Sequence, residues 1–421
     1  MHSKRLALAL TVVLPVILAF LPTISRAQGA TETVLHSFNG IDGTGPILGL
    51  TLARGNLYGV ATEGGIYNCG TVFELAPVSG GTWNETTLYT FACGRDGSTP
   101  LGSVALDKDG NVYGTTKLGG AKGVGTVFKL APSGSGWSKT ILHNFGDTGD
   151  GQYPTGSLIF DSVGDLYGTT QGGGTYGSGS EYDGGTAYEL APQSSGAWRE
   201  TILHSFGNGS DGASPRNAGL ILDKAGNLYG TTSLGGLPFS FRSTTQGTVF
   251  ELSRQTAGTW NETVLYEFNE ANGEDGYQPV AGLIYDAQGN LYGTTASGAN
   301  QGVFELSPQA GGGWTETILF SFLFCNCGNV PYSGLVFDSA GNLYGTTILN
   351  TFPYGQNDSS GEVFELSQSG GFWNLQETYG FGGTTGQNPG VGNLIFDGGK
   401  LYGAAQNGGA YNNGVVFEIT P

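Results

Sequence analysis

Histidines have the most obvious chemistry in this sequence, and three of the four share one position in a repeated pattern. His36, His143 and His204 each follow a leucine in a β-type run, and His2 lies at the extreme N-terminus. Other copies of the pattern have an aromatic residue at that position: Tyr89, Tyr266 or Phe320. A nucleophile, a histidine and a carboxylate must lie within hydrogen-bond reach of one another to act as a triad. Because repeats hold equivalent positions far apart, we interpret these histidines as half-buried strand residues rather than catalytic bases.

Tryptophans recur in the same way, each at the start of one type of run. They could form an outer belt of sugar-stacking platforms, or they could pack neighbouring units together. Packing is favoured, because a packing residue should recur in every unit whereas a binding residue need not. The six tryptophans are Trp83, Trp137, Trp198, Trp260, Trp314 and Trp373, and Ala30 takes the seventh place.

Glutamates recur in the preceding run, within Val-Phe-Glu-Leu and its variants. Apolar residues alternate with them, so we expect these carboxylates to face solvent on the flank of the molecule. Equivalent glutamates of different units cannot flank one bond as an acid and a base. The set is Glu74, Glu189, Glu251, Glu305, Glu365 and Glu418, with Lys129 at the seventh place.

Aspartates of a recurring Asp-Gly-x-x-Pro pattern are the first candidates for ligand binding. Each stands in the connection from the last run of one unit to the first run of the next. They could act only as turn formers, or they could contribute to a calcium site, which needs several oxygen ligands per ion. No metal site or other cofactor is expected beyond that alternative. These aspartates are Asp42, Asp96, Asp150, Asp211 and Asp275.

Long connections and residues that break the repeat supply the remaining candidates. The connections at 171–185, 233–247 and 348–361 are the longest, and variable aromatic loops on a repeated scaffold are a common place for binding. Charged residues outside the pattern are included because a unique site should interrupt a repeat. The candidates are Glu63, Arg95, Tyr176, Glu181, Tyr182, Arg216, Phe239, Phe241, Arg242 and Tyr354.

Four cysteines are typical of an oxidising compartment without a disulfide-dense scaffold. Cys69 precedes one run and Cys93 follows its antiparallel partner, so we expect these two to form a disulfide. Cys325 and Cys327 could pair in a small ring, remain thiols or bind a metal. No histidine or further cysteine stands near them to complete a metal shell.

The elements that hold these residues follow from a Leu/Val-Tyr-Gly core that returns every 52 to 63 residues. The seven copies are centred on Tyr58, Tyr113, Tyr167, Tyr229, Tyr292, Tyr344 and Tyr402. Each unit has four β-type runs, called A to D, separated by turns rich in Gly, Asp, Asn and Pro. Radially repeated four-stranded units are typical of a β-propeller. We predict an all-β fold, a seven-bladed β-propeller of four-stranded antiparallel blades, with a glycine opening each innermost strand A.

Ring closure is predicted from the two ends of the repeat. The repeat begins with a D-type run at 32–38 and ends with a C-type run at 415–419. The N-terminal strand should therefore complete the last blade. Residues 28–421 are expected to form a single propeller domain, and a monomer.

The N-terminus has the features of a secretory signal peptide, assigned to residues 1–27. Lys4 and Arg5 precede an apolar run at 6–21, followed by Ser25-Arg26-Ala27. The run is interrupted by Pro15 and is short for a membrane span. Removing residues 1–27 takes away three basic and no acidic residues, so the net charge of −18 becomes −21. Such a surface repels nucleic acid and anionic membranes. We expect an exported protein, extracellular, periplasmic or at the cell surface, with no nucleic-acid partner.

Several fixed residues recur together in this repeat: Gly-Asn-Leu-Tyr-Gly-Thr-Thr, then Gly-Thr-Val-Phe-Glu-Leu, Trp-x-Glu-Thr and Asp-Gly-x-x-Pro. Over residues 32–420 the pattern resembles the GloVer tandem repeat of exported bacterial choice-of-anchor proteins. The resemblance implies an exported repeat protein, secreted or at the surface, and supplies no catalytic residues.

A binding or interaction module is the function expected from these features, without catalysis. The ligand, an extracellular glycan or protein, would bind the face that has the D-to-A and B-to-C connections. The alternatives are a polysaccharide hydrolase or lyase that uses carboxylates of that face, and a structural cell-envelope protein. A unique cluster of Asp, Glu, Arg or Tyr side chains at the axial mouth would separate these hypotheses.

Overall fold

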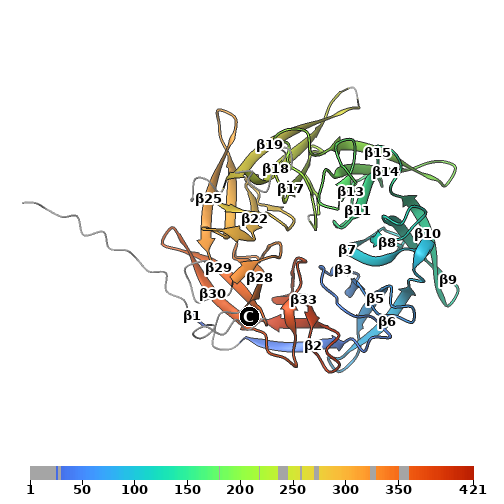
Figure 1. Cartoon of the computed structure of the whole chain (residues 1–421). Coiled ribbons are helices and arrows are strands. Elements are labelled where there is room, and N and C mark those ends of the chain that lie inside the picture. The colour runs from blue at the N-terminus through green and yellow to red at the C-terminus, as the bar shows by residue number, and fades with distance from the viewer. Residues whose placement is uncertain are drawn as a thin grey trace, which may run out of the picture.

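Seven antiparallel blades surround a common axis in the computed structural model, and the colour in Figure 1 runs once around the ring. The structure describes residues 25–26, 30–179, 181–217, 219–235, 245–256, 258–269, 275–322, 329–349 and 360–421. Blades that follow one another in the sequence are neighbours in space. The predicted seven-bladed β-propeller is confirmed.

Each blade is an antiparallel meander whose strands follow the order A to D from the axis outward. Blades 1 and 2 contain β3 (Thr51–Ala53), β4 (Asn56–Ala61), β5 (Thr71–Pro77) and β6 (Trp83–Thr90), then β7 (Ser98–Leu106), β8 (Val112–Leu118), β9 (Thr126–Ser133) and β10 (Gly136–Asn144). Blade 3 contains β11 (Gly151–Pro154), β12 (Ile159–Phe160), β13 (Leu166–Gly173), β14 (Thr186–Pro192) and β15 (Trp198–Ser205). Blade 4 contains β16 (Ile221–Leu222), β17 (Leu228–Thr232), β18 (Thr245–Arg254) and β19 (Trp260–Asn269).

The remaining blades follow the same plan. Blade 5 contains β20 (Gly276–Tyr277), β21 (Ile284–Tyr285), β22 (Leu291–Thr295), β23 (Ser297–Gly298), β24 (Gly302–Pro308) and β25 (Trp314–Ser321). Blade 6 contains β26 (Asn329–Pro331), β27 (Val336–Phe337), β28 (Leu343–Leu349), β29 (Glu362–Ser369) and β30 (Phe372–Gly380). Blade 7 contains β31 (Gln387–Pro389), β32 (Ile395–Asp397), β33 (Lys400–Asn407) and β34 (Val415–Thr420), and one 3-10 turn, η1 (Gly94–Asp96), precedes β7.

The ring closes through the N-terminal strand β2 (Thr31–Ser37), which pairs antiparallel with β34 and supplies strand D of blade 7. Figure 1 shows this blue strand beside the red strands of the last blade. The predicted closure is confirmed. A two-residue strand, β1 (Ser25–Arg26), lies parallel to β30 within the segment assigned to the signal peptide.

Strand A is interrupted in most blades where the chain passes closest to the axis. In blade 7, for example, β31 and β32 pair with the same strand β33 but are separated by Gly392. A Cβ at Gly392 would collide with the backbone of Gly49 in blade 1. This close approach explains why glycine recurs at the start of strand A.

The core consists of clusters between adjacent blades, and the tryptophans belong to them. The indole of Trp198 in blade 3 lies 6.0 Å from the ring of Tyr113 in blade 2, and Trp260 lies 6.1 Å from Tyr167 in the same relation. Trp83 closes the ring by packing on Tyr402 of blade 7 at 6.1 Å. The interpretation of the tryptophans as packing residues is confirmed.

Glutamates of strand C are less exposed than the sequence suggests. Glu74 is half-buried and accepts hydrogen bonds of 2.6 Å from the Tyr58 hydroxyl and the Asn56 amide, and Glu189 is buried. The expectation that these carboxylates simply face solvent is wrong, because neighbouring blades cover both faces of strands B and C. The Tyr229 hydroxyl likewise donates to Glu251 at 3.3 Å, whereas Glu418 accepts a hydrogen bond from Lys400 at 2.7 Å.

Candidate functional site

Connections D-to-A and B-to-C meet at one end of the ring, and every D-to-A loop bends in the same way. The residue before the loop proline has a positive φ in each blade, as at Thr99 (54°) and Tyr153 (59°). In five of these loops its N–H donates to a carbonyl of the previous blade's B-to-C segment, for instance from Thr99 to Cys69 at 3.1 Å. Through this backbone hydrogen bond, the Asp-Gly-x-x-Pro loop links neighbouring blades at this face.

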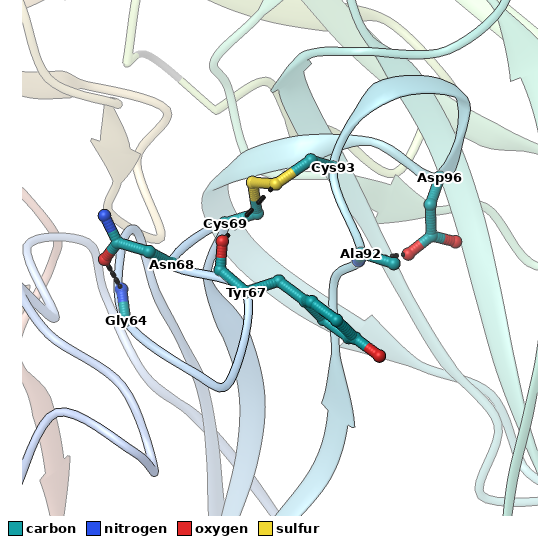
Figure 2. The surroundings of a disulfide bond; sticks show 7 residues. All are labelled: Gly64, Tyr67, Asn68, Cys69, Ala92, Cys93 and Asp96. Atoms are coloured by element: carbon teal, nitrogen blue, oxygen red, sulfur yellow. Dashed lines mark hydrogen bonds between the residues drawn. A yellow bond between two sulfur atoms is a disulfide. The ribbon is translucent and has the colours of Figure 1, made fainter.

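The disulfide between Cys69 and Cys93 fixes two of these loops, with 5.5 Å between the Cα atoms. Figure 2 shows that it joins the B-to-C loop of blade 1 to the loop that leads to blade 2. Asn68 accepts a hydrogen bond from the Gly64 N–H at 3.1 Å, and Asp96 accepts one from the Ala92 N–H at 2.7 Å. The predicted disulfide is confirmed, whereas Cys325 and Cys327 lie outside the described residues.

Three predicted residues, Glu181, Tyr182 and Arg216, lie at this face together with Lys117, and we call these four residues the mouth cluster. Glu181 forms an ion pair with Lys117 of the neighbouring blade. The Arg216 guanidinium lies over the Tyr182 ring, 5.9 Å from its centroid, and its buried Nε has no hydrogen-bond partner. Two side-chain pairs, carried by the adjacent residues Glu181 and Tyr182, thus occupy this face in a way that the other described blades do not repeat.

An axial cavity reaches Asn217, the residue that follows Arg216. Its volume is about 280 Å³, and strand-A residues of six blades line it, among them Gly49, Ser103, Ser157 and Gly282. Residues from opposite sides of the ring therefore meet at this cavity.

Exposed apolar side chains also gather on this face. Of the eleven large apolar side chains that are exposed among the described residues, seven stand in or next to its loops. They belong to blades 7, 1, 2 and 3, which are consecutive around the ring. The seven are Ile41, Ile66, Tyr67, Leu118, Tyr176, Tyr182 and Tyr411.

Other predicted site residues are placed separately. Glu63 is exposed in the B-to-C loop of blade 1, where its backbone pairs with Thr44, and Arg95 is exposed in η1. Residues predicted in the longest loops of blades 4 and 6, namely Phe239, Phe241, Arg242 and Tyr354, lie outside the described residues.

The loop aspartates point into the protein instead of toward solvent. Asp42, Asp150, Asp211 and Asp275 are between 7% and 9% exposed. Each accepts a hydrogen bond from the strand-D residue that varies between histidine and tyrosine: 3.1 Å for His36 to Asp42 and for His143 to Asp150, 2.9 Å for His204 to Asp211, and 3.1 Å for Tyr266 to Asp275.

A β-bulge aims these strand-D residues at the aspartates. The pairing of strands C and D shifts at the same place in every blade, as between Ile141 and His143, where Leu142 has no partner. A bulge turns the following side chain and strengthens the local twist. The histidines are half-buried, as predicted, and each reaches the loop of its own blade.

A glutamate from the next blade completes this arrangement, and the sequence analysis missed it. Nε2 of His143 lies 3.1 Å from Oδ2 of Asp150 and 3.4 Å from Oε2 of Glu200, which belongs to strand D of blade 3. The other Glu200 oxygen is buried and has no partner. The recurring Trp-x-Glu-Thr was the available signal: its third position is Glu85, Glu200, Glu262 and Glu316, but Lys139 in blade 2.

Burial is the largest cause of the pKa shifts of these groups between the blades. It raises the pKa of Glu200 to about 8, opposed by His143 and reinforced by Asp150. It also raises the pKa of Glu262 and of Glu316 to about 7. Burial lowers the pKa of His143, but the Asp150 hydrogen bond and the Glu200 charge outweigh it, so that the net shift is upward.

Comparisons with solved structures show the fold. A polysaccharide lyase of the PL25 family, an ulvan lyase bound to -[GlcA(1-4)Rha3S]-, is 12% identical, with a TM-score of 0.53 over 90% of this chain and 94% of the lyase. A protein from Lactobacillus plantarum is 14% identical, with a TM-score of 0.51 over 84% of this chain and 89% of that one. A puromycin-hydrolysing peptidase from Mycobacterium tuberculosis is 9% identical, with a TM-score of 0.51 over 87% of this chain and 50% of the peptidase.

Sequence comparison identifies the repeat. A search of curated proteins finds no match to the chain. The family model described as the Gloeobacter/Verrucomicrobia repeat matches residues 22–182 and 174–372, which together span most of the sequence. The chain belongs to the Gloeobacter/Verrucomicrobia repeat family.

Proposed function

We propose that this chain is an exported binding module that holds a glycan or a protein on the face formed by the D-to-A and B-to-C loops. The observation that supports this function most directly is the set of seven exposed apolar side chains on that face. Four of them are tyrosines, whose rings offer a large apolar surface and whose hydroxyls offer a hydrogen bond. Exposed apolar groups gathered on one face commonly mark an interaction site.

Export rests on the N-terminal sequence, with its basic residues, apolar run and small residues before the proposed cleavage site. The disulfide suits an oxidising compartment. Within the described part of the chain there is no helix with the length and apolar character needed to cross a membrane.

A glycan array and an extracellular-protein array, probed with the mature chain, test the binding function. The double variant Tyr67→Ala/Tyr411→Ala removes two exposed rings from blades 1 and 7. Truncation of such aromatic anchors should weaken binding about tenfold or more. The double variant Tyr285→Ala/Phe372→Ala is the matched control, because these exposed rings lie away from the loops of this face. Equal losses in both variants would contradict the proposal.

Polysaccharide hydrolysis or elimination is the second candidate, and the mouth cluster is the observation that favours it. Glu181 supplies a carboxylate, Lys117 and Arg216 supply positive charge, and Asn217, next to Arg216, lines the axial cavity. A screen of polysaccharides for new reducing ends or new unsaturated sugars tests it. Turnover by wild type that disappears in Glu181→Gln would favour this function over simple binding. If neither binding nor turnover is detected and the protein stays in the envelope fraction, a structural role would be favoured.

A further inference from the structure

At the junctions between neighbouring blades, three polar side chains meet in an arrangement that recurs around the ring. The first follows the bulge in strand D, the second is the aspartate of the following loop, and the third is the Trp-x-Glu-Thr glutamate of the next blade. Three junctions combine histidine, aspartate and glutamate: His36, Asp42 and Glu85; His143, Asp150 and Glu200; His204, Asp211 and Glu262. In the first two sets, but not in the His204 set, all three potential ligand atoms lie within 4.8 Å of one another, so only these two are candidates for a bound ion.

The His143 set has the dimensions of a metal centre. A zinc ion bound at about 2.0–2.2 Å by a tetrahedral set of ligands places those ligands roughly 3.3–3.6 Å apart. Nε2 of His143 lies 3.1 Å from the Asp150 oxygen and 3.4 Å from the Glu200 oxygen. Small side-chain movements would therefore suffice for coordination.

The same set has free ligand capacity and partial access to water. The second oxygen of Glu200 is buried without a hydrogen-bond partner. Side-chain exposure is 20% for His143, 15% for Glu200 and 6% for Asp150. A water molecule could thus complete a four-coordinate shell from the partly open side.

An independent observation comes from the junction of blades 1 and 2, where the chain itself places a cation in the equivalent position. Lys139 replaces the glutamate there, and its side chain is only 5% exposed. Its ammonium group donates to Oδ1 of Asp96 at 2.9 Å and also contacts the Asp96 carbonyl. It lies 5.4 Å from the ring centroid of Tyr89 and 4.9 Å from that of Phe91.

The His143 junction has the same surroundings without the lysine. His143 and Phe145 are the counterparts of Tyr89 and Phe91, and both pairs pack edge to face, at 4.7 Å and 5.2 Å. Burial lowers the pKa of Lys139, and the Asp96 carboxylate opposes this shift. A carboxylate and an aromatic ring both attract a cation. At the His143 junction a glutamate replaces the lysine. Two carboxylates and an imidazole are therefore available there to bind a cation from solution.

We propose that the His36–Asp42–Glu85 and His143–Asp150–Glu200 junctions each bind a divalent transition-metal ion, of which zinc is the best match. One imidazole nitrogen and two carboxylates suit zinc, whereas calcium prefers a shell made of oxygen atoms alone. Each ion would link strand D of one blade to strand D of the next. At His36 the ion would also hold the closing strand β2 to blade 1.

Zinc titration of the EDTA-treated protein, followed by calorimetry and by elemental analysis after dialysis, tests the proposal. Wild type should bind two zinc ions per chain. Glu85→Gln and Glu200→Gln should each bind one, and the double variant none. Glu316→Gln is the matched control and should still bind two, because its junction has Tyr266 in place of histidine.

A gain of binding provides the complementary measurement. The Tyr89 hydroxyl and the Lys139 ammonium both lie 2.9 Å from Oδ1 of Asp96, so this junction is compact enough for a metal ion. Tyr89→His/Lys139→Glu places a histidine and a glutamate around Asp96 there, and should raise the stoichiometry from two to three. Cobalt substitution should give the intense visible absorption of a four-coordinate site, and this absorption should increase by half in the gain variant.

Two results would overturn the proposal. One is the absence of tight zinc uptake by wild type. The other is a stoichiometry of two that persists in Glu85→Gln/Glu200→Gln. Circular dichroism of each variant distinguishes loss of the site from loss of the fold, and the gain variant gives its answer without removing any native carboxylate.

Discussion

The strand-D position after the bulge shows how one residue sets the chemistry of a blade junction. Where it is histidine, the junction brings together an imidazole and two carboxyl groups; where it is tyrosine, the hydroxyl replaces the imidazole. The Tyr266 hydroxyl lies 3.1 Å from Asp275 and 3.2 Å from Glu316. These two carboxyl groups lie close together in a buried junction, so a shared proton relieves their repulsion.

Glu316 should make folding stability depend on pH. Burial, followed by the Asp275 charge, raises its pKa to about 7 from an ordinary value of 4.5. Because the folded-state pKa is the higher one, the contribution is fully present below about pH 4.5 and is lost as the pH rises through about 7. We expect the stability difference between wild type and Glu316→Gln to shift in favour of the variant between pH 5 and pH 8. Urea denaturation midpoints at four pH values measure it, and a pH-independent difference would contradict the assignment.

Strand B shows why one short sequence recurs in all seven blades. Its tyrosine bonds to neighbouring carboxylates, and its glycine lies against an aromatic ring of strand C. A Cβ built on Gly230 would lie 2.6 Å from Cζ of Phe250 and 2.9 Å from Cδ2 of Leu220. Glycine is favoured there because these two buried side chains leave no room for a Cβ, whereas the backbone φ is not unusual.

Gly230→Ala should therefore destabilise the protein, although alanine usually stabilises a strand relative to glycine. Overpacking of a buried site typically costs about 1–3 kcal/mol. Gly136→Ala is the matched control, because a Cβ there meets nothing within 4 Å and its φ is ordinary. Chemical denaturation should show a lower midpoint for Gly230→Ala and an unchanged or higher one for Gly136→Ala. Similar midpoints for the two variants would show that strand B can shift to accept a methyl group.

At the scale of the whole molecule, stability depends on the closure of the ring. Each blade buries its faces against two neighbours, so an open ring would expose two blade faces as well as a strand edge. Strand β2 covers the edge of β34, and its surroundings bury Leu35 and Phe38 in the junction of blades 7 and 1. One strand of seven residues thus joins the first and last repeats.

Deletion of residues 28–38 should lower the thermal melting temperature sharply or prevent folding. The loss of Leu35 and Phe38 from the core alone should cost about 5 kcal/mol or more. A variant that carries residues 30–38 after Pro421, through a short turn, restores the missing partner of β34 and should recover much of the stability. A deletion variant that melts like wild type would show that the ring does not need this strand.

Much of the architecture could be predicted from the sequence, because its determinants repeat at fixed intervals. Seven Leu/Val-Tyr-Gly cores predicted seven blades, and a terminal D-type run predicted closure by β2. The Cys69–Cys93 pair followed from the expected pairing of strands C and D in blade 1. The blades and the disulfide depend on contacts within one unit, and the closure follows because the first and last runs together make one complete unit.

Only the tertiary structure decided which distant side chains meet. His143 and Glu200 belong to different blades, and their contact depends on the bulge at Leu142 and on the stagger of two adjacent sheets. The mouth cluster likewise joins Lys117 to Glu181 and Tyr182 to Arg216, through loops whose paths no repeat specifies. A periodic sequence determines the units and their order, because the backbone hydrogen bonds and the alternation of apolar and polar side chains are satisfied within each unit. The geometry between units arises from packing, and that is where this protein places its candidate sites.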